Sequence, residues 1–275
     1  MPADASRSAK KFRTGTKIRS KKRESDKPKP LPLVERTNAL SLEEFVSLYI
    51  PSSQLRIHKA GRKNQSHPST THSQGQFEHD QHKPEESDAS PYTYTLDVYT
   101  ASTIPAADLN ACFNLIELTS SAAYKASSMG WSATEKRKEM KLPDMKYMIL
   151  RWTNSDANTG TGDESSKTVG QFAGFLEFMV TYEDGYEVLY CYEIHLTPEL
   201  QGQGLGEELM LRFEHVGARI GLEKAMLTVF KSNLRATTFY ERVGYTEDES
   251  SPRPRKLRNG TVKEADYQIM SKSLR

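Results

Sequence analysis

The sequence predicts a single α/β domain, built on a twisted mixed sheet with helices on both faces and preceded by a disordered basic arm. First, the segments after Pro91 switch between the two-residue period of strands and the longer period of helices. Second, two stretches before Pro91 contain almost no apolar residues. Third, no run approaches the roughly 18 apolar residues that a membrane span needs, so we expect no membrane contact.

Residues 1–38 form the predicted arm. The first thirty residues contain 11 Lys and Arg but only 3 Asp and Glu. Because they lack periodic apolar residues, they cannot bury enough surface to offset the entropy cost of ordering. The cluster Lys21, Lys22 and Arg23 is typical of a nuclear-import or polyanion-binding patch. A solvated tail that only aids solubility would have the same composition, so both interpretations stay open.

Residues 39–58 are predicted to be a helical segment and residues 59–91 a polar linker. Ser41 and Glu44 have the spacing of a capping box, and apolar residues follow at helical spacing, namely Phe45, Leu48 and Tyr49. Five of the 7 histidines lie in or beside the linker. Since no regular spacing pairs them and no thiol accompanies them, we expect no metal site there.

Residues 92–275 are predicted to form the domain, and periodicity defines its elements. The first half contains, in order, a strand at 92–100, a helix after Pro105 with Leu109, Phe113 and Ile116 in register, a polar helix at 135–140, and strands at 146–152 and 170–180 joined by a loop at 153–168. The second half contains a strand at 187–196, a helix at 204–221, a strand at 224–230, a helix at 233–244 and a final strand at 265–274. The helix at 204–221 places five apolar residues on one face, namely Leu205, Leu209, Phe213, Val216 and Ile220.

The net charge of +2 hides an asymmetry between the two parts of the chain. Residues 1–91 carry a net charge of +6, and residues 92–275 carry a net charge of −4. The domain is therefore suited to a basic ligand. The 2 cysteines, Cys112 and Cys191, exclude a disulfide framework and a four-cysteine zinc site, and they indicate a reducing compartment.

The glycine-rich turn after Leu196 is the most specific local feature. Gly202, Gly204 and Gly206 lack β-carbons where a phosphate would approach the backbone, and the helix that follows offers free N–H donors. The turn is not a dinucleotide fingerprint, because Glu207 stands where the last glycine would be, and it lacks the Gly-Lys-Ser/Thr of a P-loop. The glycines alone leave a phosphate cradle and an empty loop equally open.

Two motifs resemble the GNAT superfamily of N-acetyltransferases. Gln201, Gly204 and Gly206 follow its acetyl-coenzyme A motif, Gln/Arg-x-x-Gly-x-Gly/Ala after a strand. The segment "NLRATTFYERVGY" is similar to a second motif of the superfamily, through Asn233, Ala236, Phe239, Tyr240, Gly244 and Tyr245. The resemblance implies a GNAT fold, acetyl-CoA as the cosubstrate and no metal.

A closer resemblance covers roughly residues 120–270. The strings "SSMGWSATEKRKEM", "YEVLYCYEIHL", "MLTVFKSN" and "EDESSP" resemble the N-alpha-acetyltransferase D family, and "LYCYE" is the most distinctive. The resemblance implies acetylation of the α-amine of N-terminal Ser in histone tails beginning Ser-Gly-Arg-Gly. It implies histone N-terminal peptides and coenzyme A as partners, no direct requirement for nucleic acid, and a location in the nucleus and cytoplasm. We expect a monomer.

The resemblance also assigns roles to residues. The catalytic group comprises Glu193, Tyr192, Tyr190 and Tyr240. The coenzyme-binding group comprises Ile194, His195, Leu196, Gln201, Gly202, Gln203, Gly204, Leu205, Gly206 and Asn233. The substrate-binding group comprises Tyr124, Trp131, Tyr190, Tyr192, Thr228 and Tyr267. Glu193 would assist deprotonation of the amine, and Tyr240 stands where many members keep a tyrosine that protonates the leaving thiolate. The tyrosines and Trp131 would also suit ordinary packing.

Glu193 is the least expected residue of its strand, because a carboxylate among apolar residues is costly unless it is paired or functional. Simple alternation places Glu193 with Cys191, on the face opposite Tyr190 and Tyr192. Either a bulge turns the Glu193 side chain to the face of Tyr192, or Glu193 acts through a water relay.

One departure from the family concerns substrate recognition. Related enzymes have acidic residues where this chain has Met179 and Thr181, and Glu183, Asp184 or Glu187 would have to compensate. A lysine or small-amine acetyltransferase therefore stays an alternative. A second alternative is a chromatin- or nucleic-acid-binding protein with an inactive acetyltransferase body, in which the basic arm does the binding.

Overall fold

The structure is a computed structural model that describes residues 31–59, 92–153 and 170–275. The predicted basic cluster at Lys21, Lys22 and Arg23, nearly all of the predicted linker and the loop after Thr153 lie outside the described residues. From Pro32 onward the chain forms one unit.

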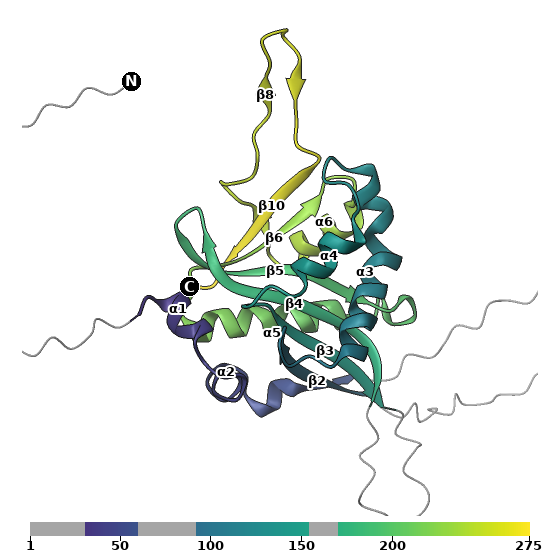
Figure 1. The fold of residues 1–275 in the computed structure, drawn as a ribbon, viewed down its shortest axis with the longest axis vertical. Helices are drawn as coiled ribbons and strands as arrows, with labels where there is room; N and C mark the ends of the chain where they lie inside the picture. Colours follow the sequence, from purple (N-terminus) through teal and green to yellow (C-terminus); the bar gives the residue numbers. More distant parts are fainter. Residues whose placement is uncertain (1–30, 60–91, 154–169) are drawn as a thin grey trace, which may run out of the picture. The chain divides into compact units, whose positions relative to one another are not determined.

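A mixed sheet carries this unit (Figure 1). Its strands are β1 (Arg56–Lys59), β2 (Tyr92–Thr100), β3 (Lys146–Thr153), β4 (Gln171–Glu183), β5 (Tyr186–Leu196), β6 (Lys224–Phe230), β7 (Thr246–Glu247) and β10 (Tyr267–Ser273). They follow the spatial order β1-β2-β3-β4-β5-β6-β10-β7, and β5 and β6 form the parallel pair among otherwise antiparallel neighbours. Strands β8 (Arg255–Lys256) and β9 (Val262–Lys263) pair with each other in a separate hairpin.

Helices cover both faces of the sheet, as predicted. On one face lie α1 (Leu33–Asn38), α2 (Leu42–Tyr49), α5 (Leu205–Ile220) and α6 (Leu234–Arg242), and on the other lie α3 (Ala106–Ala126) and α4 (Ala133–Glu139). Two short 3-10 helices are η1 (Ser52–Leu55) and η3 (Pro198–Leu200). The five apolar residues predicted to share one face of α5 are all buried. The predicted fold class is therefore confirmed.

The start of the described chain differs from the prediction. Residues 33–38, which the sequence analysis assigned to the arm, form α1, and Asn38 donates a side-chain hydrogen bond to the Val180 carbonyl at 2.9 Å. Local composition hides this helix, because its stability comes from packing on β4 rather than from its own periodicity. The capping box of α2 is confirmed on Ser41 and Glu44, whereas Leu48 is 51% exposed.

Candidate active site

A β-bulge in β5 creates the site. In the register between β4 and β5, Glu177 lies opposite Glu193 and Phe178 lies opposite Cys191, so Tyr192 has no partner residue. The extra residue turns both Tyr192 and Glu193 toward the face covered by α3 and α4, whereas Cys191 packs in the core under α5. Strict alternation is therefore wrong for this strand, and the structure contains the bulge.

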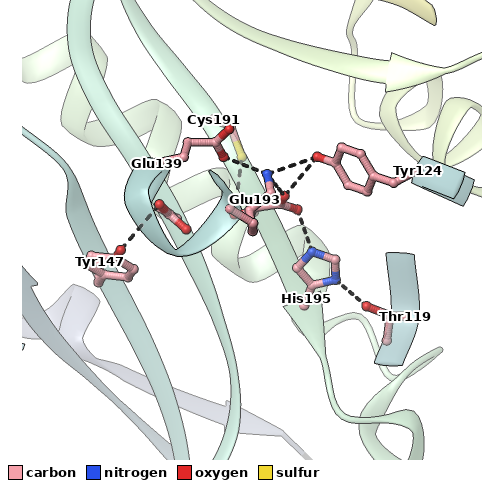
Figure 2. Close-up of polar contacts among 9 residues, drawn as sticks. Thr119, Tyr124, Glu139, Tyr147, Cys191, Glu193 and His195 are labelled. Carbon is pink, nitrogen blue, oxygen red and sulfur yellow. Dashed lines mark hydrogen bonds and ion pairs between the residues drawn. The ribbon is translucent and has the colours of Figure 1, made fainter. Parts of the chain in front are cut away.

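Glu193 is the centre of the site, as Figure 2 shows. Its side chain is 7% exposed. Its Oε1 accepts hydrogen bonds from Lys136 Nζ at 2.8 Å and from the Tyr124 hydroxyl at 3.2 Å. Its Oε2 lies 2.6 Å from His195 Nε2. Because a buried charge is costly unless it is paired, these contacts explain how the strand tolerates Glu193.

Lys136 of α4 supplies the cation. Its ammonium uses all three donors, on Glu193 at 2.8 Å, on Glu139 Oε1 at 2.6 Å and on the Tyr124 hydroxyl at 3.1 Å. The nitrogen also lies 4.9 Å from the centre of the Tyr124 ring. Ser132 caps the start of α4 and holds this short helix in place. The helix thus places a buried positive charge beside Glu193 of β5.

These contacts fix the charge states of the pair. Burial alone would raise the pKa of Glu193, but the hydrogen bond from His195 and the charge of Lys136 outweigh it and lower that pKa to about 2. Burial alone would lower the pKa of Lys136, and the charge of Glu193 reverses this and raises it above its ordinary value. Glu193 is therefore an anion, and Lys136 a cation, at any pH near neutrality.

His195 links the buried carboxylate to the surface. Because the ionised Glu193 only accepts hydrogen bonds, the Nε2 of His195 carries a proton and donates it. Its Nδ1 lies 2.8 Å from the hydroxyl of Thr119, an exposed residue of α3. The resemblance placed His195 among the coenzyme-binding residues, and the structure shows its side chain between Glu193 and Thr119.

A second carboxylate, Glu177 of β4, lies opposite Glu193 in the sheet. Its Oε1 accepts a hydrogen bond from the Tyr147 hydroxyl at 3.3 Å, and its Oε2 has no partner among the described residues. Burial, followed by the charge of Glu193, raises the pKa of Glu177 well above its ordinary value. The two facing carboxyl groups therefore differ, since their surroundings raise the pKa of Glu177 and lower that of Glu193.

Aromatic residues border this network on the side of α3. The ring centre of Tyr124 lies 5.6 Å from that of Trp131 and 5.0 Å from that of Phe230. Trp131 also lies 6.2 Å from Phe113, so it joins this aromatic cluster to the core. Tyr124 and Trp131, both predicted to bind substrate, are thus brought together. Tyr267, also predicted to bind substrate, begins β10 opposite Phe230.

A second aromatic group lies along β5. The rings of Tyr190 and Tyr192 are 5.3 Å apart, and the Tyr190 hydroxyl lies 2.6 Å from the Thr228 hydroxyl of β6. Burial raises the pKa of Tyr190 to about 12, although the hydrogen bond to Thr228 opposes this. These three residues therefore form a neutral, hydrogen-bonded wall beside Glu193.

The separation of β5 from β6 shapes the coenzyme side of the site. The parallel ladder ends at Cys191 and Leu227, although both strands continue beyond it. From Ile194 to Leu196, the described strands provide β5 with a neighbour only in β4. This leaves a stretch of backbone edge that leads directly to the glycine turn.

The glycine turn between β5 and α5 has a backbone that needs glycine. Gly202 has a φ of 73° and Gly204 a φ of 78°, and a Cβ on Gly206 would lie 3.4 Å from the Phe239 ring of α6. No side chain caps the start of α5. Its first N–H groups, from Leu205 onward, are therefore available to an anion such as a phosphate.

Three further residues predicted to bind coenzyme brace the chain through their side chains. The Gln201 amide donates to the carbonyl of Leu196 at 3.2 Å, and the Gln203 amide donates to a carbonyl of η3 at 2.9 Å. Asn233 caps α6 by accepting a backbone N–H at 3.1 Å. These side chains stabilise the turn, and a ligand would contact its backbone.

Tyr240 is buried on α6, with its ring centre 5.2 Å from that of Phe239 and 6.0 Å from that of Tyr245. Burial raises its pKa, and the charge of Glu193 adds to this effect. The phenol therefore keeps its proton and is able to donate it. Burial likewise raises the pKa of the Cys191 thiol, which stays protonated.

Sequence reasoning missed Lys136, Thr119, Phe230 and Glu177. The signal for Glu177 was present, since it is a lone carboxylate in an apolar strand in the same way as Glu193. Lys136 gave no signal, because it lies among five charged residues of a short polar helix and nothing local distinguishes a buried lysine from an exposed one.

Two further predictions concern a metal ion and a membrane span. In residues 31–59, 92–153 and 170–275, no group of three or more His, Cys, Asp or Glu is placed to hold a metal ion. No helix within these ranges is long and apolar enough to cross a membrane.

Comparison with known proteins gives a family match and a curated relative. Residues 125–245 match the acetyltransferase (GNAT) family. N-alpha-acetyltransferase 40 of Saccharomyces cerevisiae is 29% identical over 154 residues, which are 53% of this chain and 54% of that protein. The chain thus matches about half the length of this curated relative.

The solved structures that match this chain are distant in sequence. The ribosomal-protein-S18-alanine N-acetyltransferase of Escherichia coli is 18% identical, with a TM-score of 0.40, over 66% of this chain and 94% of that chain. The spermidine N-acetyltransferase of Vibrio cholerae, solved with CoA and spermine, is 17% identical, with a TM-score of 0.42, over 65% and 95%. The match to the acetyltransferase (GNAT) family is thus a similarity over residues 125–245, which are 121 of the 275 residues.

Proposed function

We propose that this protein transfers an acetyl group from acetyl-CoA to the N-terminal α-amine of polypeptides. The proposal rests on the ionised, buried Glu193, which contacts an aromatic cluster through Tyr124 and lies on the strand that precedes a glycine turn able to bind an anion. The similarity to a yeast protein named N-alpha-acetyltransferase 40 supports the same assignment.

The residues present fit the coenzyme. Acetyl-CoA supplies an activated thioester when bound. The N–H groups at the start of α5 would hold its phosphates, since no side-chain cap occupies them among the described residues. The backbone edge of β5 from Ile194 to Leu196 would pair with the extended part of the coenzyme, because β6 has separated from it.

The substrate amine needs little activation. An α-amine with a pKa of about 7.7–8.0 is roughly 10–15% neutral at pH 7, whereas a lysine with a pKa of about 10.4 is well below 0.1% neutral. A carboxylate whose pKa is about 2 is a weak proton acceptor. We therefore assign Glu193 an electrostatic role, in which it orients the amine and stabilises the positive charge that develops on nitrogen during attack.

Other groups would complete the transfer. The bulge leaves Tyr192 without a partner residue in β4, and in this scheme its backbone N–H would stabilise the oxyanion. Tyr240 keeps its proton because of burial and would give it to the departing thiolate. In this scheme the amine bonds to the acetyl carbon, the carbon–sulfur bond breaks, the amine proton passes to solvent, and Tyr240 regains a proton from solvent.

The direct test is acetylation of a synthetic peptide. With the purified protein and acetyl-CoA, the peptide Ser-Gly-Arg-Gly-Lys should gain one acetyl group on its α-amine, located by mass spectrometry. The same peptide carrying an α-acetyl group should not react. Acetylation of its lysine would contradict the N-terminal assignment and favour the lysine or small-amine alternative.

For histone-type tails, we propose that Glu183 supplies the acid missing at positions 179 and 181. Residues of β4 alternate, so Glu183 lies on the same face as Met179 and Thr181, and its charge contributes to the raised pKa of Tyr190. Met179 packs against the core cluster under α3 and offers no charge to a basic residue.

Glu183→Gln is therefore expected to raise KM for Ser-Gly-Arg-Gly-Lys by about tenfold, the usual effect of losing a hydrogen bond to a charged group, with little change in kcat. The peptide Ser-Gly-Ala-Gly-Lys should show no such change. Asp184→Asn is the matched control, because Asp184 lies in the exposed turn with a φ of 47° that asparagine tolerates. Equal effects of the two variants would refute the assignment.

A further inference from the structure

The β8–β9 hairpin projects from the main sheet (Figure 1). Every residue from Arg253 to Glu264 is exposed, and the two strands pair only with each other. The hairpin is closed by backbone hydrogen bonds between Leu257 and Thr261 and between Gly260 and Leu257. Apolar burial therefore contributes almost nothing to its order.

The hairpin is strongly basic. Residues 253–263 contain no acid and five cations, namely Arg253, Arg255, Lys256, Arg258 and Lys263. Within the part of the chain that the structure describes, these five side chains form no ion pair. Arg255 lies directly opposite Lys263 in the pairing of the two strands. Like charges at such positions destabilise a hairpin, so its own folding does not explain this composition.

We propose that this basic hairpin is a contact surface for double-stranded nucleic acid. Adjacent residues of a strand point to opposite faces, so Arg255 and Lys263 lie on one face of the ribbon and Lys256 on the other. A two-stranded ribbon fits the major groove of a duplex, where phosphates line both walls. Cations on both faces of a ribbon match that arrangement, and arginine binds phosphate through two parallel hydrogen bonds.

The composition of the hairpin tip favours nucleic acid over a membrane as the partner. Arg258, Asn259, Gly260 and Thr261 form the turn and none of them is apolar, and the exposed apolar residues beside it are Leu257 and Val262, neither of which is aromatic. A membrane-inserting loop would carry large apolar or aromatic side chains there. The hairpin joins the body near the loop between α3 and α4, because Asp266 accepts hydrogen bonds there from the backbone and the hydroxyl of Ser128.

The test measures duplex binding by the full chain as a function of salt. Fluorescence anisotropy with a labelled 20-base-pair duplex is compared for the unchanged protein and for the triple variant Arg255→Gln, Lys256→Gln and Lys263→Gln. Each lost phosphate contact lowers the slope of log K against log salt by about 0.9, so we expect the slope to fall by about two to three and affinity at low salt to fall at least tenfold. No turnover is measured, so the outcome is independent of the proposed function.

A matched control removes the same charge elsewhere. Arg36, Lys125 and Lys141 are exposed residues outside the hairpin, and their triple change to Gln should lower the slope by less than about one. Equal losses in the two triple variants would overturn the proposal. So would equal or tighter binding of the unchanged protein to polyglutamate or to anionic vesicles at the same charge concentration, because the hairpin would then recognise negative charge of any kind.

Discussion

Replacing Lys136 by methionine is expected to lower the free energy of unfolding by about 3–5 kcal/mol, because Glu193 is left as a buried charge without its cation. Methionine keeps most of the apolar stem, so the loss reflects charge rather than an empty space. Urea unfolding at pH 7 measures it. Peptide acetylation should fall at least about tenfold in the same variant, since Glu193 and Tyr124 lose the donor that positions both.

Two comparisons identify the cause of this loss. Lys138→Met removes a cation from the same helix, but its pair with Glu135 is mostly exposed, so stability should change by no more than about 1 kcal/mol. The double variant Lys136→Met with Glu193→Gln removes the unpaired charge as well, and it should recover most of the lost stability without recovering activity. Failure of the double variant to recover stability would mean that packing, and not charge, explains the role of Lys136.

The pH dependence of stability tests the charge pair of Glu193 and Lys136 independently. Glu193 has a pKa of about 2 in the folded protein against an ordinary value of 4.5, so its ionised form stabilises the fold above about pH 4.5, and this contribution is lost as the pH falls toward 2. Without Lys136, burial is less opposed and the pKa of Glu193 rises. The difference in stability between the Lys136→Met variant and the unchanged protein should therefore shrink as the pH falls below about 4.5.

Local patterns predicted the fold because each element carries its own signal. The apolar face of α5 and the capping box of α2 are local features, and both are confirmed. Helix α1 and strand β1 carry weak local signals and are held by partners distant in sequence, such as the Val180 carbonyl that binds Asn38. Periodicity within a segment contains no information about such partners.

Some residues of the site could be predicted from local motifs, and those that depend on distant partners could not. Tyr190 and Tyr192 lie in the distinctive string "LYCYE", and the resemblance over residues 120–270 assigned Tyr124 to substrate binding. The bulge at Tyr192 is invisible to a two-residue period, because one inserted residue reverses the faces of everything after it. Lys136 and His195 become partners of Glu193 only when α4 packs beside β5, which no local pattern specifies.

Glu193→Gln is expected to lower kcat at least about tenfold while the binding of acetyl-CoA is unchanged, because the anion that stabilises charge on the attacking nitrogen is lost. The variant should fold, since Glu139 still pairs with Lys136 at 2.6 Å. Steady-state kinetics and calorimetric titration with acetyl-CoA measure the two quantities. Unchanged turnover would remove Glu193 from the mechanism. In the unchanged protein, the acidic limb of the pH–rate profile should follow the substrate amine, near about 7.7–8.0, and not a carboxylate.

Substitutions of His195 decide how Glu193 works. His195 donates a proton from Nε2 to the carboxylate, and a glutamine amide offers a comparable donor while being unable to carry a proton in the reaction. If Glu193 acts as a fixed anion, His195→Gln should keep most of the activity and His195→Ala should lose about tenfold or more, because a partner of a buried charge is removed. If His195→Gln is as inactive as His195→Ala, the imidazole itself moves a proton, along the path that ends at the exposed Thr119. The electrostatic role of Glu193 would then have to be replaced by general base catalysis through the Glu193–His195 pair.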